Sequence, residues 1–303
     1  LVFRFAPAQE QVKLLLAGEV DLVTELPGTM TTSVEASSQA RVAKQRTFWT
    51  VGATMNTDSG ALSDVRVRRA LNLAIDREAL VRYDIRGNGS ALATLTMPGE
   101  EGHAPDLEPY PHDPDAARRL LEQAGVEMPL VLKALVRAQA QRTALIIKAQ
   151  LEKIGVQLDI QAVYSDAEVI RGLQSEAWDI AIAGLPDPMC HSFFIQSILL
   201  FSKSPFSLQN DPEFDRRLME VVQTLDDAQR ARLGRELDHY VYEQALSLFT
   251  YQKIKTYGAR LGVEFTPYIS GMPYFFDARI VPRPEAAAAT AATAATEATA
   301  PLP

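Results

Sequence analysis

Strands and helices alternate through the middle of the chain, and this alternation limits the possible folds more than any other feature of the sequence. Apolar runs of strand length, rich in Val, Ile and Leu, are separated by longer segments with helical periodicity. The expected order is strand Leu130–Val136, helix Gln139–Ile154, strand Val156–Val163, helix Asp166–Ala177 and strand Trp178–Ala183. Strands that alternate with helices of this length predict an α/β module with a largely buried sheet.

A second patterned stretch, Leu62–Gly89, precedes this module and predicts an amphipathic helix followed by a shorter one. Ser63 or Asp64 can cap the first helix, because a short polar side chain accepts a hydrogen bond from a free N–H of the first turn. The apolar stripe at helical spacing comprises Val67, Ala70, Leu71, Ala74 and Ile75. We place on the opposite, polar face Arg66, Arg68, Arg69, Arg77 and Glu78.

Further elements are expected on both sides of these two stretches. Strands are predicted at Val2–Phe5, Val20–Leu26, Thr47–Asn56 and Leu248–Tyr257. Helices are predicted at Gln9–Ala17, between Asp113 and Gly125, at Asp215–Leu225 and at Asp227–Tyr251. The Ala/Thr-rich tail Ala286–Pro303 lacks large apolar residues, so we expect it to be disordered.

Composition and charge argue against several classes of function. The chain has 303 residues, 47% of them hydrophobic, which suffices for one or two domains with a sizeable core. The net charge of −8 and the absence of a basic stripe argue against a nucleic-acid partner, which would need cations to replace phosphate counterions. Cys190 is the only cysteine, so no internal disulfide can form. No apolar run reaches the ~18–20 residues that span a bilayer.

Neither a metal site nor an enzymatic centre is indicated. Met189, Cys190 and His191 offer three ligand atoms, but adjacent residues rarely point at one ion, and no second histidine–carboxylate cluster accompanies them. The sequence contains no GxSxG, Walker-type, GxGxxG or HExxH motif. Carboxylate pairs such as Glu100 and Glu101 lie in loop contexts that favour a solvated role. We therefore expect no metal, no cofactor and no catalytic residues.

The amino-acid sequences of several segments resemble the family 5 bacterial extracellular solute-binding proteins, the peptide- and nickel-type receptors of ABC importers. The resemblance is strongest in the segment that reads "DVRVRRALNLAIDREALV" and is followed by "GNG" at Gly87–Gly89. Five other segments follow the family's order, namely Leu14–Pro27, Ala53–Thr57, Pro111–Gly125, Gln150–Ile160 and Asn210–Leu218. The resemblance covers roughly residues 8–282.

This resemblance implies a periplasmic-binding-protein-like fold of type II, similar to cluster C, in which two lobes close on a ligand. Residues 1–57, with 258–284 returning, would belong to lobe I, residues 58–257 would form the second lobe, and 285–303 a disordered tail. The N-terminal part of the fold would precede Leu1, so the chain is expected to be the C-terminal portion of a longer receptor. The implied function is capture of a peptide-like or other small polar solute for an ABC permease, by a monomer in the periplasmic or extracytoplasmic space.

The resemblance also points to the loop that follows the strand Trp178–Ala183, because loops at strand ends carry ligand contacts in α/β folds. In peptide-binding members a carboxylate of this loop pairs with the ligand ammonium, which implies Asp187 here, with Gly184 and Leu185 beside it. The tryptophan that usually precedes this carboxylate is absent, and the loop is shorter. The alternative is that Asp187 only forms a turn before Pro188.

Three further residues are candidates for the same cleft. Met55 and Asn56 end a strand, although an asparagine at a strand end often serves local turn chemistry. Phe193, together with Phe194 and Phe206, could form the floor of a pocket or belong to the core.

Two other functions stay open from the residues alone. One is a regulatory or protein-interaction module that reuses this fold, and the other is a carboxylate-based hydrolase.

Overall fold

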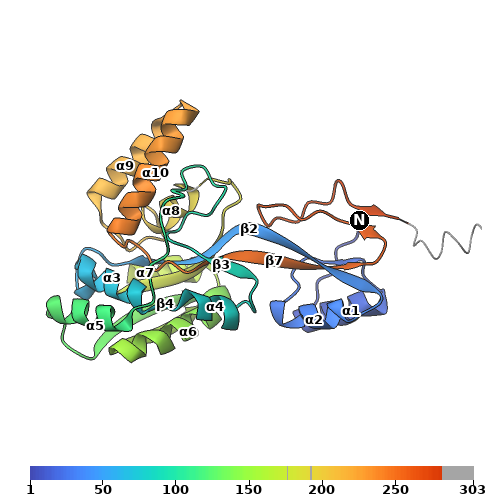
Figure 1. Cartoon of the computed structure of the whole chain (residues 1–303), viewed down its shortest axis with the longest axis horizontal. Coiled ribbons are helices and arrows are strands. Elements are labelled where there is room, and N and C mark those ends of the chain that lie inside the picture. The colour runs from blue at the N-terminus through green and yellow to red at the C-terminus, as the bar shows by residue number, and fades with distance from the viewer. Residues whose placement is uncertain (176, 192, 282–303) are drawn as a thin grey trace, which may run out of the picture. The chain divides into compact units, whose positions relative to one another are not determined.

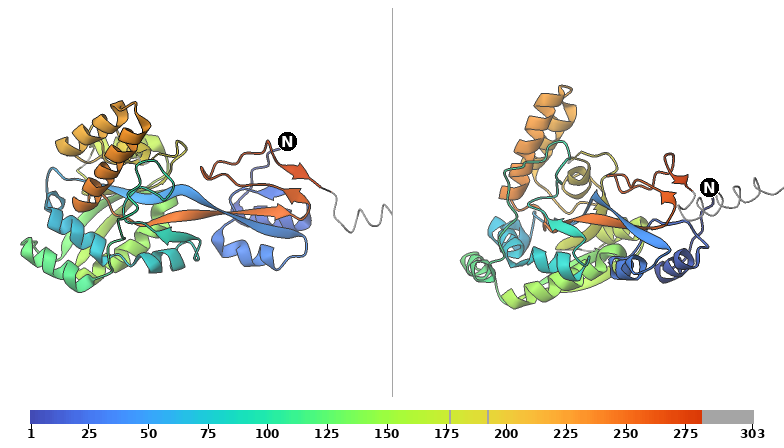
Figure 2. Two further views of the ribbon diagram at one scale, coloured as in Figure 1. Left: turned by 45° about the horizontal axis from the view of Figure 1, so that its top comes forward. Right: turned by 45° about the vertical axis from the view of Figure 1, so that its right-hand side comes forward.

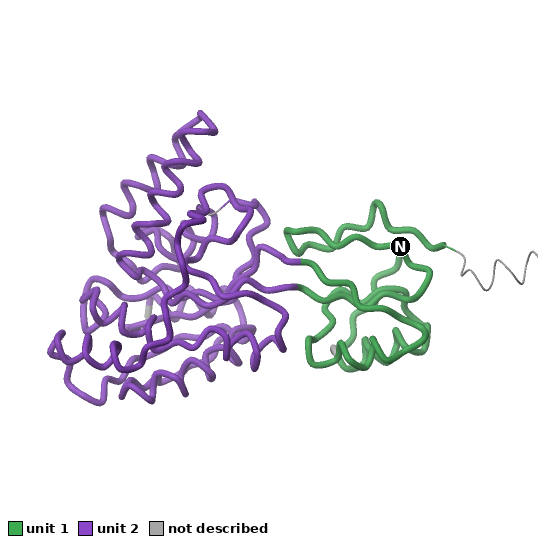
Figure 3. Tube along the Cα trace, in the orientation of Figure 1, with its two compact units in different colours: residues 1–45, 255–303 green, residues 46–254 purple. Residues whose placement is uncertain are grey.

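The computed structural model describes residues 1–175, 177–191 and 193–281 (Figure 1). The chain divides into two compact units, coloured separately in Figure 3. Unit 1 comprises Leu1–Gln45 and the chain from Lys255, and unit 2 comprises Arg46–Ile254. The first boundary falls inside a long strand, earlier than the expected boundary at Thr57. The Ala/Thr-rich tail lies outside the described residues.

Unit 1 is small and contains short elements. It holds α1 Ala8–Ala17, β1 Leu22–Val23, α2 Thr31–Glu35, the first part of β2 Ala40–Met55, the last part of β7 Tyr251–Arg260, β8 Val263–Glu264 and β9 Arg279–Ile280. Helix α1 ends, as predicted, at Gly18, which adopts the left-handed conformation with φ of 76°. The predicted strand Val2–Phe5 is wrong: this segment pairs with no strand among the described residues, and Phe5 is 95% exposed.

Unit 2 contains the predicted alternation of strands and helices. Its elements are α3 Val65–Ala74, α4 Arg77–Tyr83, β3 Gly89–Ala91, α5 Pro114–Gln123, β4 Leu130–Arg137, α6 Gln141–Leu151, β5 Val156–Val163, α7 Asp166–Ser175, β6 Ile180–Pro186, α8 Phe193–Leu199, α9 Pro212–Gln223 and α10 Asp227–Glu243, together with the ends of β2 and β7 that lie in this unit. The predicted helix Asp227–Tyr251 ends earlier, because the chain turns at Ala245, whose φ is 47°.

One mixed sheet runs in the order β1-β7-β2-β6-β4-β5, and β3 pairs with β7 outside this path. Strands β5, β4 and β6 are parallel, whereas β6 pairs with β2 in antiparallel orientation. The parallel strands are joined by α6 and α7, as crossover connections require. The α/β class predicted from the sequence is therefore confirmed.

Side chains on the unit 2 strands alternate between apolar cores on the two faces of the sheet. Ala134 and Val136 of β4 face the larger core, which residues of α3, α4, α5 and α6 complete. Leu135, between them, faces the other side and packs with Val169 of α7 and Trp178. Figures 1 and 2 show α3 to α6 on one side of the sheet and α8 to α10 on the other. Strands β4 and β6 inside the sheet are accordingly almost continuously apolar, whereas β5 at the end of the sheet alternates apolar with exposed polar residues.

The apolar stripe of α3 is buried as predicted, but two arginines assigned to the polar face of this stretch, Arg68 of α3 and Arg77 of α4, are not exposed. Asp64 caps α3 by accepting a hydrogen bond from the Arg66 N–H at 2.7 Å. Arg68 and Arg77 are only 5% and 4% exposed. Each guanidinium donates to three main-chain carbonyl groups, and Arg77 also donates to the Asn72 side chain. Hydrogen bonds to carbonyl oxygens make the burial of these cations possible without a carboxylate partner.

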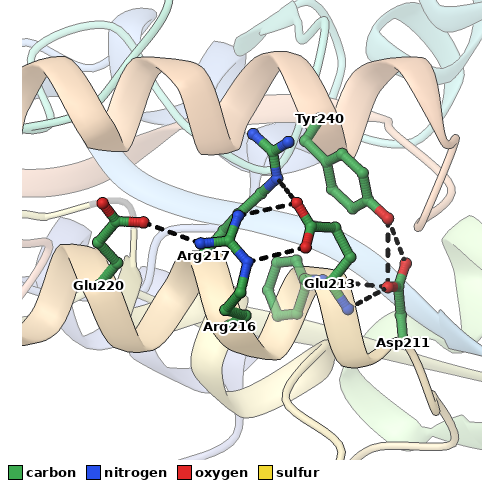
Figure 4. Close-up of polar contacts among 7 residues, drawn as sticks. Asp211, Glu213, Arg216, Arg217, Glu220 and Tyr240 are labelled. Atoms are coloured by element: carbon green, nitrogen blue, oxygen red, sulfur yellow. Dashed lines mark hydrogen bonds and ion pairs between the residues drawn. The ribbon is translucent and has the colours of Figure 1, made fainter.

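Helices α9 and α10 pack against each other and are joined by a polar network (Figure 4). Asp211 caps α9, and the Tyr240 hydroxyl of α10 donates to both of its oxygens at 3.2 and 3.0 Å. Glu213 accepts hydrogen bonds from Arg216 and Arg217. These bonds lower the pKa of Glu213 to about 2, and the bond from Arg216 contributes most. Among the described residues, no helix is both long enough and apolar enough to cross a membrane.

Candidate functional site

The carboxyl ends of the parallel strands define the candidate site in unit 2. The pairing of β4 with β6 ends at Val136 and Ile182, whereas β6 continues along β2 as far as Pro186. From Ala183 onward, β6 therefore extends beyond the last residue pair that it forms with β4. Ligands of open α/β sheets bind at this edge, where loops leave the strands.

A small cavity of about 30 Å³ lies at this edge. Its wall is formed by residues of five elements, β2, β4, β6, α7 and α8, and of the segment after α8, and it includes Leu135, Arg137, Leu185, Ile198 and Phe206. Most of these residues are apolar, and Arg137 is the charged residue of the lining. A volume of about 30 Å³ corresponds to about one water molecule, so the cavity marks an apolar recess beside Arg137 at the strand ends and is not a complete solute pocket.

Arg137 is the functional candidate that sequence reasoning missed. It is the last residue of β4, and its side chain is 23% exposed. Its Nη2 lies 2.6 Å from Oδ1 of Asp166, the first residue of α7, whose own side chain is 63% exposed. A guanidinium has five donors, so this ion pair leaves others available to a ligand. The available signal was its position, since Arg137 is the charged residue at the carboxyl end of a predicted parallel strand.

Asp187 is fully buried, and its contacts are those of the turn alternative. Its carboxylate accepts hydrogen bonds from the N–H groups of Met189, Cys190 and His191 at 2.7, 3.1 and 2.9 Å. The Asp187 N–H donates to the main-chain oxygen of Phe48 on β2 at 2.6 Å. Asp187 thus shapes the loop from within, and the contact with a ligand ammonium stays a prediction.

A second buried carboxyl group, that of Glu100, lies against Asp187. Glu100 is 5% exposed, and its Oε2 accepts a hydrogen bond from the Met97 N–H at 2.7 Å. Burial, a hydrogen bond with Asp187 and the charges of Asp187 and Asp238 raise the pKa of Glu100 to about 9. At neutral pH Glu100 therefore holds a proton and can donate it in a hydrogen bond to the Asp187 carboxylate. Two loops distant in the sequence are joined by this pair.

The other residues predicted for this site either line the cavity or pack against aromatic rings near it. Leu185 lines the cavity and is 8% exposed. Gly184 is buried, and a Cβ atom at this position would lie 2.5 Å from the ring of Trp49. Phe193 is partly buried and stacks on the His191 ring with centroids 3.8 Å apart, while Phe206 lines the cavity.

Met55 and Asn56 make local and core contacts. Met55 has no exposed surface and lies in the larger core, because its side chain alternates onto the inner face of β2. The Asn56 oxygen accepts hydrogen bonds from the N–H groups of Asp58 and Ser59 at 3.1 and 3.2 Å. This is the turn chemistry given as its alternative. We leave both residues out of the site proposed below.

Within the described residues, no group of three or more His, Cys, Asp and Glu side chains is placed to hold a metal ion. Cys190 has a positive φ of 62°. The pKa of its thiol is raised mainly by burial and further by the charges of Asp187 and Glu100. A raised pKa disfavours the thiolate that would bind a metal.

Comparison with known proteins identifies relatives over most of the chain. Residues 1–199 match the family model described as "Bacterial extracellular solute-binding proteins, family 5 Middle". A probable di/tripeptide-binding protein 5 of Pseudomonas aeruginosa is 26% identical over 262 residues, which are 82% of this chain and 49% of that protein. Heme-binding protein A of Haemophilus influenzae is 25% identical over 261 residues, or 81% of this chain and 47% of that protein. The chain thus spans about half the length of these relatives.

Solved structures show the same fold. The periplasmic binding protein DppA from Helicobacter pylori, in complex with the peptide STSA, superposes with a TM-score of 0.78 at 18% identity. The match covers 91% of this chain and 55% of that one. The predicted periplasmic-binding-protein-like fold is therefore confirmed.

Proposed function

Because the chain belongs to the family 5 bacterial extracellular solute-binding proteins, we propose that it serves as substrate-binding component of an ABC importer. It would act outside the cytoplasmic membrane and deliver its solute to a membrane permease. The solute would be peptide-like or another small polar molecule that carries a carboxylate.

The observation that carries this proposal is the position of Arg137 beside the cavity at the carboxyl edge of the sheet. A guanidinium binds a carboxylate through two parallel hydrogen bonds, and this contact is strong where water is partly excluded. The names of the relatives agree with this chemistry, since peptides and haem both carry carboxylates.

The loop after β6 would complete the site. Leu185 supplies apolar wall, and Gly184 leaves space for the Trp49 ring. Asp187 would act mainly by holding the loop in shape through its three N–H contacts, and Phe193 would lie at the end of the loop. An ammonium contact with Asp187 would require the loop to open.

The test is a thermal unfolding screen with dipeptides, tripeptides, haem and nickel chelates. A solute that binds only the folded chain raises the melting temperature, because binding shifts the unfolding equilibrium by mass action. Arg137→Ala should abolish most of the shift, whereas Lys133→Ala, at an exposed position of the same strand, should retain it. Esterifying the carboxylate of an active solute should mimic Arg137→Ala.

Absence of a shift with every solute would contradict a binding role for this chain. An equal shift in both variants would remove Arg137 from the site.

A further inference from the structure

Strand β3 has one paired edge and one open edge. It pairs in antiparallel orientation with β7, with Gly89, Ser90 and Ala91 opposite Lys253, Gln252 and Tyr251. Among the described residues no other strand pairs with β3. Such an edge presents unpaired main-chain groups to its surroundings.

The register shows which groups point outward. The Ile254 N–H donates to the Asn88 oxygen at 2.8 Å, and the Leu92 N–H donates to the Thr250 oxygen at 3.1 Å. Hydrogen-bonded pairs alternate along an antiparallel ladder, so Ser90 also directs its main-chain groups to β7. The N–H and C=O groups of Gly89 and Ala91 consequently point away from β7, and no described group bonds to them.

This open edge lies in the wall of a groove of about 580 Å³, formed between β3 and α4. Three charged side chains line the groove, namely Arg82, Arg86 and Glu78. Both arginines are exposed, and neither forms an ion pair with a described carboxylate. The groove therefore carries an excess of positive charge on a chain whose net charge is −8.

We propose that the open edge of β3 binds an extended acidic polypeptide segment, which adds to the sheet as a further strand and places carboxylates on Arg82 and Arg86. Strand addition needs two features that this groove combines: unpaired donors and acceptors at strand spacing, and space for side chains beside them. The exposed arginines select acidic side chains, because each can bind a carboxylate through its fork of donors.

The groove is separate from the proposed solute site. None of its lining residues belongs to the cavity beside Arg137. The partner is a polypeptide with backbone amides in extended form, not a small carboxylate.

The test uses Ala91→Pro, which removes one outward N–H group. Proline is tolerated on an edge strand where its nitrogen faces away from the ladder, so pairing with β7 should persist. Ala91→Val is the matched control, because it keeps the N–H group. The probe is a fluorescein-labelled short peptide of alternating Glu and Val, compared with its Lys and Val counterpart and with acetate and succinate as competitors.

We expect fluorescence anisotropy to detect binding of the acidic peptide to the 303-residue chain. Ala91→Pro and the double variant Arg82→Ala/Arg86→Ala should each weaken it by about tenfold or more. Ala91→Val and Arg137→Ala should leave it unchanged, and hydrogen exchange at the Gly89 and Ala91 amides should slow on binding.

Four results would overturn the proposal. They are equal binding of the basic peptide, undiminished binding to Ala91→Pro, full competition by succinate at the peptide's own concentration, and loss of binding in Arg137→Ala. The melting temperatures of Ala91→Pro and Ala91→Val should be close. A difference in peptide binding between them then reflects the lost N–H group and not a loss of folding.

Discussion

Replacing Glu100 by glutamine should change how the stability of the protein depends on pH. The folded chain keeps Glu100 protonated up to pH 9 or so, since its pKa is raised from 4.5 to about 9, whereas the unfolded chain releases this proton near the ordinary value. Between these two values the folded state binds one more proton than the unfolded state. The stabilisation is therefore complete at low pH and is lost as the pH rises toward 9.

The size of the effect follows from the shift. Each pH unit in this window removes at most about 1.4 kcal/mol, so between pH 5 and pH 8 the loss approaches about 4 kcal/mol. Glutamine at this position is neutral at every pH and can still donate a hydrogen bond to Asp187. Glu100→Gln should thus be more stable than the wild-type chain at pH 8, with the difference shrinking toward pH 5.

The assay is urea unfolding of both chains at several pH values, followed by circular dichroism. Subtracting the two curves removes the contributions of all other titrating groups. The control is Glu101→Gln, because Glu101 is ion-paired with Arg230 at 2.8 Å and not buried against a carboxylate. A difference between Glu100→Gln and wild type that does not vary with pH would refute the assignment of the proton to Glu100.

Three further substitutions test the packing of unit 2. Arg77→Ala should lower the free energy of unfolding by about 3–5 kcal/mol in urea titrations, because it leaves buried carbonyl groups without their charged donor; a loss below about 1 kcal/mol would contradict this. Gly184→Ala should cost about 1–3 kcal/mol and alter the fluorescence of Trp49, whose ring lies 2.5 Å from the added Cβ; an unchanged melting curve and spectrum would show that the ring yields freely. Tyr240→Phe should cost about 1 kcal/mol by removing the hydrogen bonds to Asp211, and equal melting temperatures would place this hydroxyl outside the network that joins α9 and α10.

The elements that periodicity predicts well are those whose burial is set by local pattern. β4 and β5 were expected at nearly their observed bounds, because β4 is an almost continuous apolar run and β5 alternates apolar with polar residues, and both patterns are typical of strands. The predicted strand Val2–Phe5 failed for the complementary reason: its pattern fits a strand, but a strand requires a partner that pattern alone does not supply.

The polar interior was less predictable, because it depends on contacts between distant segments. Arg77 looks like a surface residue of an amphipathic helix, and only the fold brings the Tyr110 carbonyl within 3.1 Å of its Nη1. Glu100 was assigned to a solvated loop, yet it lies against Asp187. Arg137 was missed although its place at a strand end was visible in the sequence.

We have proposed that this chain binds a carboxylate-bearing solute, and a binding protein releases its solute unaltered. The decisive measurement is isothermal titration of the chain with the solute that most raises its melting temperature, followed by mass spectrometry of the recovered solute. We expect saturable binding that Arg137→Ala strongly weakens, with the solute recovered chemically intact. Conversion of the solute to a product, or binding that Arg137→Ala leaves unchanged, would contradict it.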